Sequence, residues 1–267
     1  MIRNLHLSLL PLWSASILFP LLQFVICPTT VYSNNLYAPH HPVHIDTLTL
    51  MDSLRQRPIP IAIYRKNNLQ LTKNQKVIIL NHGYNDNRRY SYLGYSFLAE
   101  YLAAKNYFVV SIQHELPTDS LLPRNGIPQI VRRPFWERGA DNILYVIQSL
   151  RHSHPKLDFK HLTLIGHSNG GDMTALFAQQ HPLMVDKLIT LDNRRMPLPR
   201  TNHPQIYSLR SSDQVPDEGV LPDGAEIEKF KITIVNLPHT AHNDMCDAAT
   251  TYQRREMIRH ILKFLKD

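Results

Sequence analysis

Ser168 lies at the centre of the pentapeptide G-H-S-N-G, residues 166–170, which fits the pattern G-x-S-x-G. In this pattern the serine occupies a sharp turn between a strand and a helix, so the residues two before and two after it must be small. Gly166 and Gly170 meet that requirement. A serine hydroxyl raised above a sheet by such a turn can act as a nucleophile when a base removes its proton.

The residues on either side of the pentapeptide indicate that this turn forms. Residues 162–165, Leu-Thr-Leu-Ile, are a short apolar run typical of a buried strand. Residues 172–180 have the spacing of an amphipathic helix, which ends before Pro182. We therefore predict a functional turn rather than an ordinary strand-turn-helix connection. The amide of Asn169 would lie at the helix N-terminus, where unpaired N–H groups favour negative charge.

A base is needed next, and an open parallel sheet brings such groups together at the carboxyl ends of its strands. The segment after the last expected strand holds two histidines, His239 and His242. His242 comes immediately before the terminal helix, where a loop can turn its imidazole toward Ser168. We assign the base to His242 and keep His239 as the alternative. With Asp244 these histidines could instead hold a metal ion, but that site would leave the serine motif unexplained, and we expect no metal.

An acid must fix the tautomer of the base and stabilise its charged form. The strand expected at residues 205–209 runs into a loop that contains Asp213 and Asp217. Asp213 lies four residues past the strand end, close enough to be held rigidly, so we assign the acid to it. Asp217 is the first alternative, and Asp192, after the preceding strand, is the second. Each of the three could instead be a turn-forming aspartate.

Two backbone N–H groups should face the oxygen that becomes charged during acyl transfer. One would be the amide of Asn169. The other is expected from the loop after the apolar strand at residues 76–80, where Gly83 allows the turn and the amide of Tyr84 points at the site. We expect His82 to brace this loop.

Strands and helices alternate through the centre of the chain, which predicts an α/β fold with a mostly parallel central sheet and helices on both faces. Two antiparallel strands, with prolines that suit an edge, precede this region. The expected strands cover residues 44–51, 59–64, 76–80, 107–113, 162–165, 187–191, 205–209 and 231–237, and the expected helices cover residues 90–106, 134–152, 172–180 and 248–266.

Residues 1–33 carry one positive charge near their start and then a long apolar run, which is typical of a secretory signal peptide. The run is also long enough for an uncleaved membrane anchor. We expect residues 34–44 to be a connector and residues 45–267 to be the folded domain of a secreted or periplasmic protein. Loss of the leader would leave Cys246 as the only cysteine, so we expect a buried thiol and no internal disulfide.

The chain of 267 residues is basic, with a formal net charge of +7 and short arginine clusters at residues 88–89, 132–133, 194–195 and 254–255. A solvated basic surface explains this charge most simply, and contact with anionic lipid or an acidic substrate is the alternative. We expect no nucleic-acid binding, because no basic helix is interleaved with aromatic residues.

With G-H-S-N-G, the H-G-Y of residues 82–84 and the late Asp and His, the chain resembles the α/β-hydrolase superfamily over about residues 45–267. Residues 57–61 and the S-I-Q-H-E-L-P of residues 111–117 are similar to bacterial secreted members related to dienelactone hydrolases and platelet-activating-factor acetylhydrolase-like esterases. This resemblance implies the α/β-hydrolase fold and an acyl-serine mechanism with no metal or organic cofactor.

Many members of the superfamily carry a lid between the strands expected to end near residue 191 and to begin near residue 205. Only residues 192–204 are available here, so we expect no separate lid domain and an open site bordered by residues 115–133. The acid loop is one residue shorter than the resemblance implies, which keeps Asp217 open beside Asp213.

The expected function is that of a secreted or periplasmic serine hydrolase, similar to a carboxylesterase or lipase, that cleaves carboxylic esters of small to medium size. Ser168 would form the acyl intermediate, with His242 and Asp213 completing a triad. The alternatives are a peptidase or thioesterase with the same triad, and a non-catalytic protein of this fold that binds a partner or a membrane.

Overall fold

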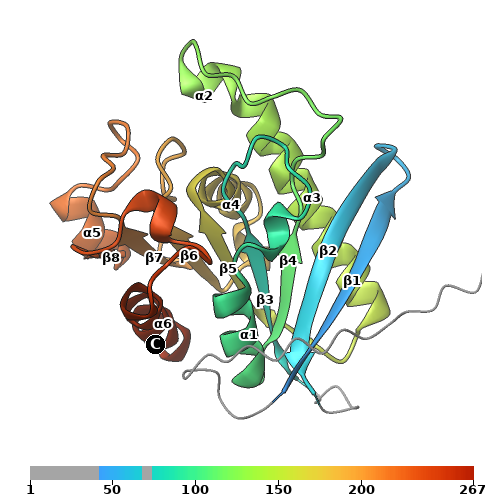
Figure 1. The fold of residues 1–267 in the computed structure, drawn as a ribbon. Helices are drawn as coiled ribbons and strands as arrows, with labels where there is room; N and C mark the ends of the chain where they lie inside the picture. The colour runs from blue at the N-terminus through green and yellow to red at the C-terminus, as the bar shows by residue number, and fades with distance from the viewer. Residues whose placement is uncertain (1–41, 68–73) are drawn as a thin grey trace, which may run out of the picture. The chain divides into compact units, whose positions relative to one another are not determined.

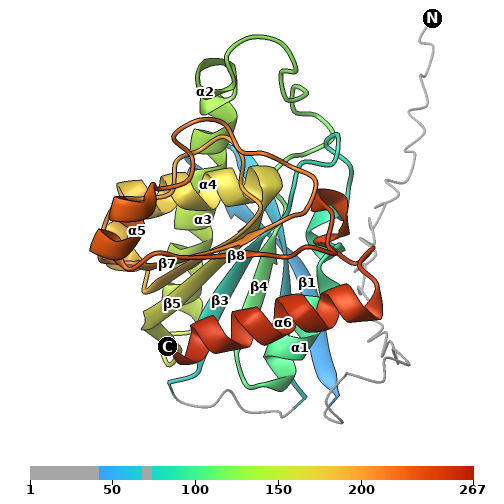
Figure 2. The same cartoon turned by 90° about the vertical axis from the view of Figure 1, so that its left-hand side faces the viewer.

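The computed structural model describes residues 42–67 and 74–267, which form an eight-stranded sheet with helices on both faces (Figures 1 and 2). The strand order is β1-β2-β4-β3-β5-β6-β7-β8, and every pair from β4 to β8 is parallel. The strands are β1 (Val43–Asp52), β2 (Arg57–Lys66), β3 (Lys76–Asn81), β4 (Phe108–Ile112), β5 (Asp158–His167), β6 (Lys187–Leu191), β7 (Gln205–Arg210) and β8 (Thr233–Asn236).

The helices divide between the two faces because successive residues of each strand point to opposite sides. On one face Val77 and Ile79 of β3 pack into a cluster with α3 and α4, and on the other Ile78 and Leu80 pack into a cluster with α1 and α6. The helices are α1 (Ser96–Ala104), α2 (Pro128–Val131), α3 (Arg133–Ser153), α4 (Ser168–Gln180), α5 (Gly224–Phe230) and α6 (Thr251–Lys266), with short 3₁₀ turns η1 (Ser91–Leu93), η2 (Pro182–Met184) and η3 (His242–Asp244).

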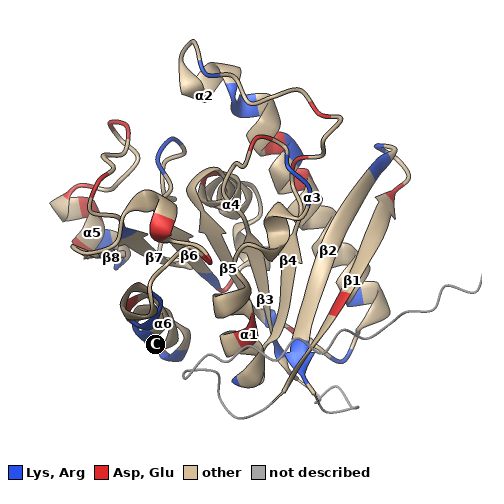
Figure 3. Cartoon of the chain, in the orientation of Figure 1, with Lys and Arg blue, Asp and Glu red and all other residues tan. Residues whose placement is uncertain are grey.

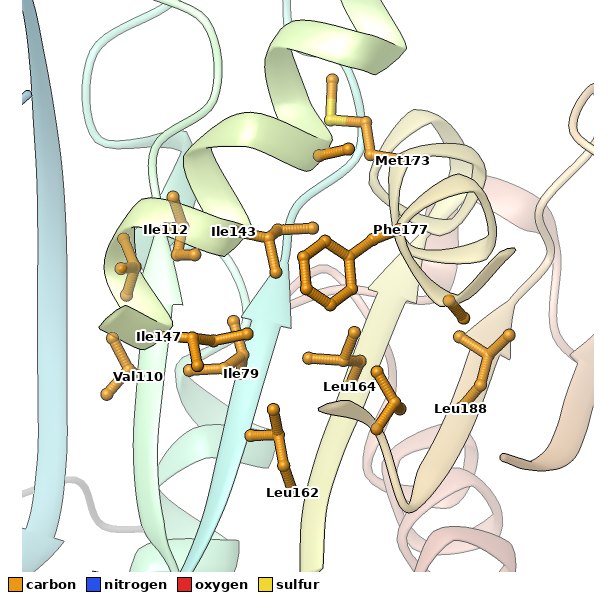
Figure 4. Packing of buried hydrophobic residues seen from close by; sticks show 14 of the residues in the cluster. Ile79, Val110, Ile112, Ile143, Ile147, Leu162, Leu164, Met173, Phe177 and Leu188 are labelled. Atoms are coloured by element: carbon orange, nitrogen blue, oxygen red, sulfur yellow. The ribbon is translucent and has the colours of Figure 1, made fainter. Parts of the chain in front are cut away.

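The core between the sheet and α3 and α4 holds the central strands rigidly. Figure 4 shows Phe177 of α4, Ile143 of α3 and Leu164 of β5 in this layer, and all three side chains are fully buried. Burial of each such side chain stabilises the fold by about 1.5–3 kcal/mol relative to its exposure. The same packing fixes the strand ends, from which the loops of the site emerge.

The first two strands are antiparallel, as their sequence predicts, but β2 is not an edge strand. It pairs with β1 on one side and, through residues 61–64, with β4 on the other. Its prolines, Pro58 and Pro60, lie beyond this pairing with β4. Only the carbonyl of Pro60 still bonds in that direction, accepting from the N–H of Gln113. The missing proline donors therefore end the β2–β4 ladder.

Most expected elements are present, with differences at their ends. The helix expected over residues 90–106 is divided into η1 and α1, and α4 begins at Ser168 instead of at residue 172. The sequence analysis missed α2 and α5. The second of these has a recognisable start, because Asp223 and Glu226 form a reciprocal capping box.

The leader and most of the connector, residues 1–41, lie outside the described residues, so their predicted roles stay predictions. Within residues 42–67 and 74–267, no helix combines the length and the apolar character needed to cross a bilayer.

Candidate active site

Ser168 occupies a strained turn between β5 and α4. Its φ angle is 51°, in the left-handed region that serine rarely adopts. The flanking glycines make this turn possible: a Cβ on Gly166 would lie 2.3 Å from Oγ1 of Thr174, and a Cβ on Gly170 would lie 2.3 Å from the carbonyl oxygens of Asn81 and His82. Any larger residue at either position would collide with neighbouring atoms. The turn leaves the Ser168 side chain partly exposed above the sheet.

The loop after β8 returns the imidazole of His242 to this serine. His242 begins η3, and its Nε2 lies 2.9 Å from Oγ of Ser168, although 74 residues separate the two in the sequence. The alternative base, His239, is exposed and has its ring beside Tyr252 of α6. The structure therefore brings together Ser168 and His242, and it leaves His239 at the surface.

The carboxylate beside His242 belongs to Asp192, and this corrects the assignment of the acid to Asp213. Oδ2 of Asp192 lies 2.5 Å from Nδ1 of His242. Asp192 directly follows β6, whose last residue, Leu191, is the register partner of His167 at the end of β5. The residue after β6, Asp192, therefore lies beside the residue after β5, which is Ser168.

Asp213 holds the backbone of His242 instead of its ring. Its exposed carboxylate accepts a 2.6 Å hydrogen bond from the N–H of His242, and this bond lowers the pKa of Asp213. The second candidate, Asp217, is paired with Arg195 and accepts a hydrogen bond from Gln129. Neither side chain can therefore orient the imidazole directly.

Asp192 is fully buried, and its neighbours keep it ionised. Burial by itself opposes the charge, but hydrogen bonds from His242 and Ser211 and the charge of Arg210 outweigh it, so the pKa of Asp192 lies below its ordinary value. The Arg210 guanidinium lies 2.9 Å from Oδ1, and the hydroxyl of Ser211 donates to Oδ2 at 2.7 Å. A fixed negative charge at this point stabilises a protonated imidazole.

The two residues expected to stabilise a developing oxyanion, Tyr84 and Asn169, both line the pocket that contains Ser168. Asn169 is the second residue of α4, where a backbone N–H has no carbonyl partner within the helix. Its side chain is fixed on two sides, because it accepts from the indole N–H of Trp136 and donates to the carboxylate of Glu115.

A buried chain of hydrogen bonds, which the sequence analysis missed, connects the loops of the site. The N–H of Gly83 donates to the hydroxyl of Tyr95, and that hydroxyl lies 2.6 Å from Nδ1 of His167. Nε2 of His167 then lies 3.0 Å from the carbonyl oxygen of His242. Burial and the neighbouring His242 lower the pKa of His167 to about 3, so its ring is neutral and can accept at Nδ1 while donating at Nε2.

His82 braces the loop after β3, as its position in that loop suggested. Its Nδ1 lies 2.7 Å from the carbonyl oxygen of Gly83, and its Nε2 accepts from the N–H of His114. Burial lowers the pKa of His82 to about 4, so the ring is neutral near pH 7 and carries its proton on Nδ1. His82 has no contact with Ser168 or His242 among these hydrogen bonds.

No family model and no curated protein matches this sequence. Solved structures do match. An esterase of the fungus Rhizomucor miehei is 14% identical, with a TM-score of 0.59 over 85% of this chain and 84% of that one. An esterase of Pyrobaculum calidifontis is 14% identical, with a TM-score of 0.58 over 85% and 86%. A protein of Klebsiella pneumoniae that is described as a dienelactone hydrolase is 14% identical, with a TM-score of 0.53 over 84% of this chain and 99% of that one.

The chain has the α/β-hydrolase fold. This agrees with the resemblance carried by its serine motif and H-G-Y loop.

In this α/β-hydrolase fold β6 and β7 are joined by residues 192–204, which contain no helix or strand, and no lid domain is inserted there. Beside Ser168 lies a pocket of about 270 Å³, which Leu122 and Arg132 line from the loop at residues 115–133.

Within the described part of the chain, no three His, Cys, Asp or Glu side chains are placed to hold a metal ion. Cys246 is a free cysteine, but it is only partly buried, whereas the sequence analysis expected a buried thiol. Its thiol donates a hydrogen bond to the carbonyl oxygen of Asn243.

Proposed function

We propose that this protein is a serine hydrolase that cleaves carboxylic esters through an acyl-serine intermediate. The observation that carries the proposal is the continuous contact from Ser168 to His242 to Asp192, at 2.9 and 2.5 Å. A serine hydroxyl is a weak nucleophile without an adjacent base, and the base works best when a third group orients it. The three side chains meet both conditions, and Ser168 lines the pocket.

In the first half of the reaction, Oγ of Ser168 attacks the ester carbonyl while Nε2 of His242 takes the hydroxyl proton. The tetrahedral intermediate collapses to an acyl-serine when the bond to the alkoxy group breaks, and the imidazolium returns its proton to that group, which leaves as the alcohol. Asp192 remains ionised throughout and holds the proton on Nδ1 of His242.

In the second half, His242 removes a proton from water, and the resulting hydroxide attacks the acyl carbonyl. The second tetrahedral intermediate then releases the carboxylic acid, and Ser168 recovers its proton from the imidazolium. We propose that the amides of Tyr84 and Asn169 bind the oxyanion in both intermediates. In comparable sites one such donor stabilises the transition state by about 3–4 kcal/mol.

A fluorophosphonate probe tests the proposal most directly, because it phosphonylates only a serine that a base activates. We expect stoichiometric labelling of Ser168 in the folded protein and turnover of a 4-nitrophenyl ester, with both lost in Ser168→Ala. The matched control is Ser153→Ala, since Ser153 lies on the exposed end of α3 and bonds only near its own helix. Labelling that persists in Ser168→Ala would reject the assignment.

The same triad could serve a peptidase or thioesterase, and a panel of matched ester, thioester and amide substrates separates these activities. Failure of the probe to label folded protein would favour a non-catalytic protein of this fold, whose function is to bind a partner or membrane. Secretion, with cleavage of residues 1–33, remains part of the proposal and is tested by N-terminal sequencing of the exported protein.

A further inference from the structure

The pocket beside Ser168 is lined by four arginines against two aspartates. Arg124 and Arg132 come from the loop after β4, and Arg194 and Arg195 come from the loop after β6. Figure 3 shows that Lys and Arg residues occur on the segment around α2 and on the loop between β6 and β7. Two separate loops therefore direct positive charge into the space where a substrate of Ser168 would lie.

Two of these arginines have carboxylate partners of their own. Arg195 is paired with Asp217, and the exposed Arg124 lies 3.4 Å from Asp86. These pairs neutralise part of the charge around the pocket, and they account for one of the two lining aspartates.

The other two arginines, Arg132 and Arg194, form no ion pair among the described residues. Nε of Arg132 donates a hydrogen bond to the carbonyl oxygen of Pro123, and this bond helps to hold the Arg132 guanidinium in place. Nε of Arg194 is buried and has no hydrogen-bond partner. A buried donor left unpaired costs about 1–3 kcal/mol, so a ligand that accepts from Arg194 would recover part of that cost.

The second lining aspartate, Asp172, accepts hydrogen bonds from backbone N–H groups. Its Oδ1 accepts hydrogen bonds from the N–H groups of Arg194, Arg195 and Met196, at 2.9 to 3.1 Å. Asp172 thus fixes the turn that presents Arg194 to the pocket. Burial raises its pKa to about 6, so Asp172 is still mostly ionised near pH 7 and offsets part of the positive charge.

The positive charges are also close enough to repel one another. Burial and, after it, the charges of Arg195 and Arg194 lower the pKa of Arg132, and the carboxylates of Asp172 and Asp217 offset only part of this effect. An anion placed between the arginines would relieve this repulsion, and guanidinium groups match the planar oxygens of a carboxylate or the oxygens of a phosphate.

We propose that the substrate is an ester that also carries an anionic group, a carboxylate or a phosphate, which binds between Arg132 and Arg194 while its ester carbonyl lies at Ser168. This inference rests on the proposed function and specifies its substrate class. The pocket volume of about 270 Å³ accommodates a small anionic group.

Three acetate esters that differ only in one substituent test the proposal: 4-acetoxybenzoate, 4-acetoxyphenyl phosphate and the neutral 4-acetoxybenzamide. We expect kcat/KM for at least one anionic ester to exceed that for the neutral ester by about tenfold or more, a difference of about 1.4 kcal/mol. The better anionic ester identifies carboxylate or phosphate as the preferred group. The preference should weaken as salt is added, because the charges are partly screened.

Arg132→Gln and Arg194→Gln should each lower the anionic-to-neutral ratio of kcat/KM by about tenfold. Comparing this ratio between each variant and the wild type cancels the intrinsic reactivity of the esters and any general loss of activity. The matched control is Arg133→Gln, because Arg133 is adjacent in sequence but pairs with Glu137 on the exposed side of α3. A wild-type ratio near one, or a ratio that neither pocket variant changes, would overturn the proposal.

A binding measurement separates failure of this proposal from failure of the proposed function. We expect 4-acetamidobenzoate, whose amide resists hydrolysis, to bind Ser168→Ala protein at least about tenfold more tightly than its methyl ester does, and to lose this advantage in the Ser168→Ala/Arg194→Gln double variant. Equal binding of acid and methyl ester would contradict the anion site even if neutral esters are cleaved. Selective binding without ester cleavage would support the anion site and count against the esterase.

Discussion

Asp192 and His242 are 50 residues apart in the sequence, yet a carboxylate oxygen of the first lies 2.5 Å from Nδ1 of the second. The contact exists because β6 pairs directly with β5, so the residue after β6 lies beside the turn that presents Ser168. Asp213, after β7, reaches only the backbone N–H of His242. The two aspartates therefore support the same histidine in different ways, and substitution can distinguish them.

We predict that Asp192→Asn lowers kcat/KM by about 10³–10⁴-fold, because the amide would favour the wrong tautomer of His242 and would not stabilise its charged form. Asp213→Asn should lower it by less than about tenfold, since an amide oxygen can still accept from the N–H of His242. Initial rates on a neutral acetate ester measure both effects, with circular dichroism as the check on folding. The opposite ranking would restore Asp213 as the acid.

We predict that Tyr95→Phe lowers kcat by about tenfold or more and changes KM little, because the loss of one hydroxyl releases both Gly83 and His167 from their fixed positions. The free energy of unfolding should also fall by about 1–3 kcal/mol, as a buried donor and acceptor lose their partner. The control is Tyr252→Phe, because Tyr252 is exposed on α6. Equal kinetics in the two variants would argue against a positioning role for Tyr95.

We predict that Gly170→Ala destabilises the protein by about 3 kcal/mol or more, because its Cβ would lie 2.3 Å from two backbone carbonyl oxygens that cannot move independently of β3. Gly224→Ala, at the start of α5, should change stability by less than about 1 kcal/mol, since a Cβ there meets no atom within 4 Å. Urea unfolding of both variants measures the difference. A stable, active Gly170→Ala protein would mean that strand and helix do not approach as closely as described.

We predict that Glu115→Gln stabilises the protein relative to wild type more at pH 8 than at pH 5. Burial raises the pKa of Glu115 to about 7. Between about pH 4.5 and pH 7 the folded state therefore keeps a proton on this carboxyl group that the unfolded state has lost. The free energy of unfolding of the wild-type protein should therefore fall as pH rises through this window, and Glu115 should contribute up to about 3 kcal/mol of the decrease. Glutamine does not ionise, so the variant should not show this decrease. Unfolding free energies at the two pH values provide the test. A pH-independent difference between the proteins would show that Glu115 does not titrate in this range.

The serine turn and most of the strands and helices could be predicted from the sequence alone. The run at residues 162–165 is hydrophobic because β5 is covered on both faces, and G-H-S-N-G predicts the turn because only small residues allow the approach that Gly166 and Gly170 make. These are local properties, which depend on neighbouring residues and on burial. For the same reason the helical spacing in α3 and the apolar strand β3 could be recognised from the sequence.

Which aspartate lies beside His242, and which side chains line the pocket, could be seen only in the tertiary structure. Whether Asp192 or Asp213 meets His242 depends on which strand lies beside β5, and no residue in either loop encodes that order locally. The arginine clusters at residues 132–133 and 194–195 suggested a solvated surface, but the packing of two loops places Arg132 and Arg194 on the same pocket. Such contacts depend on the path of the whole chain, which is why sequence spacing predicted the turn at Ser168 but not all of the side chains that surround it.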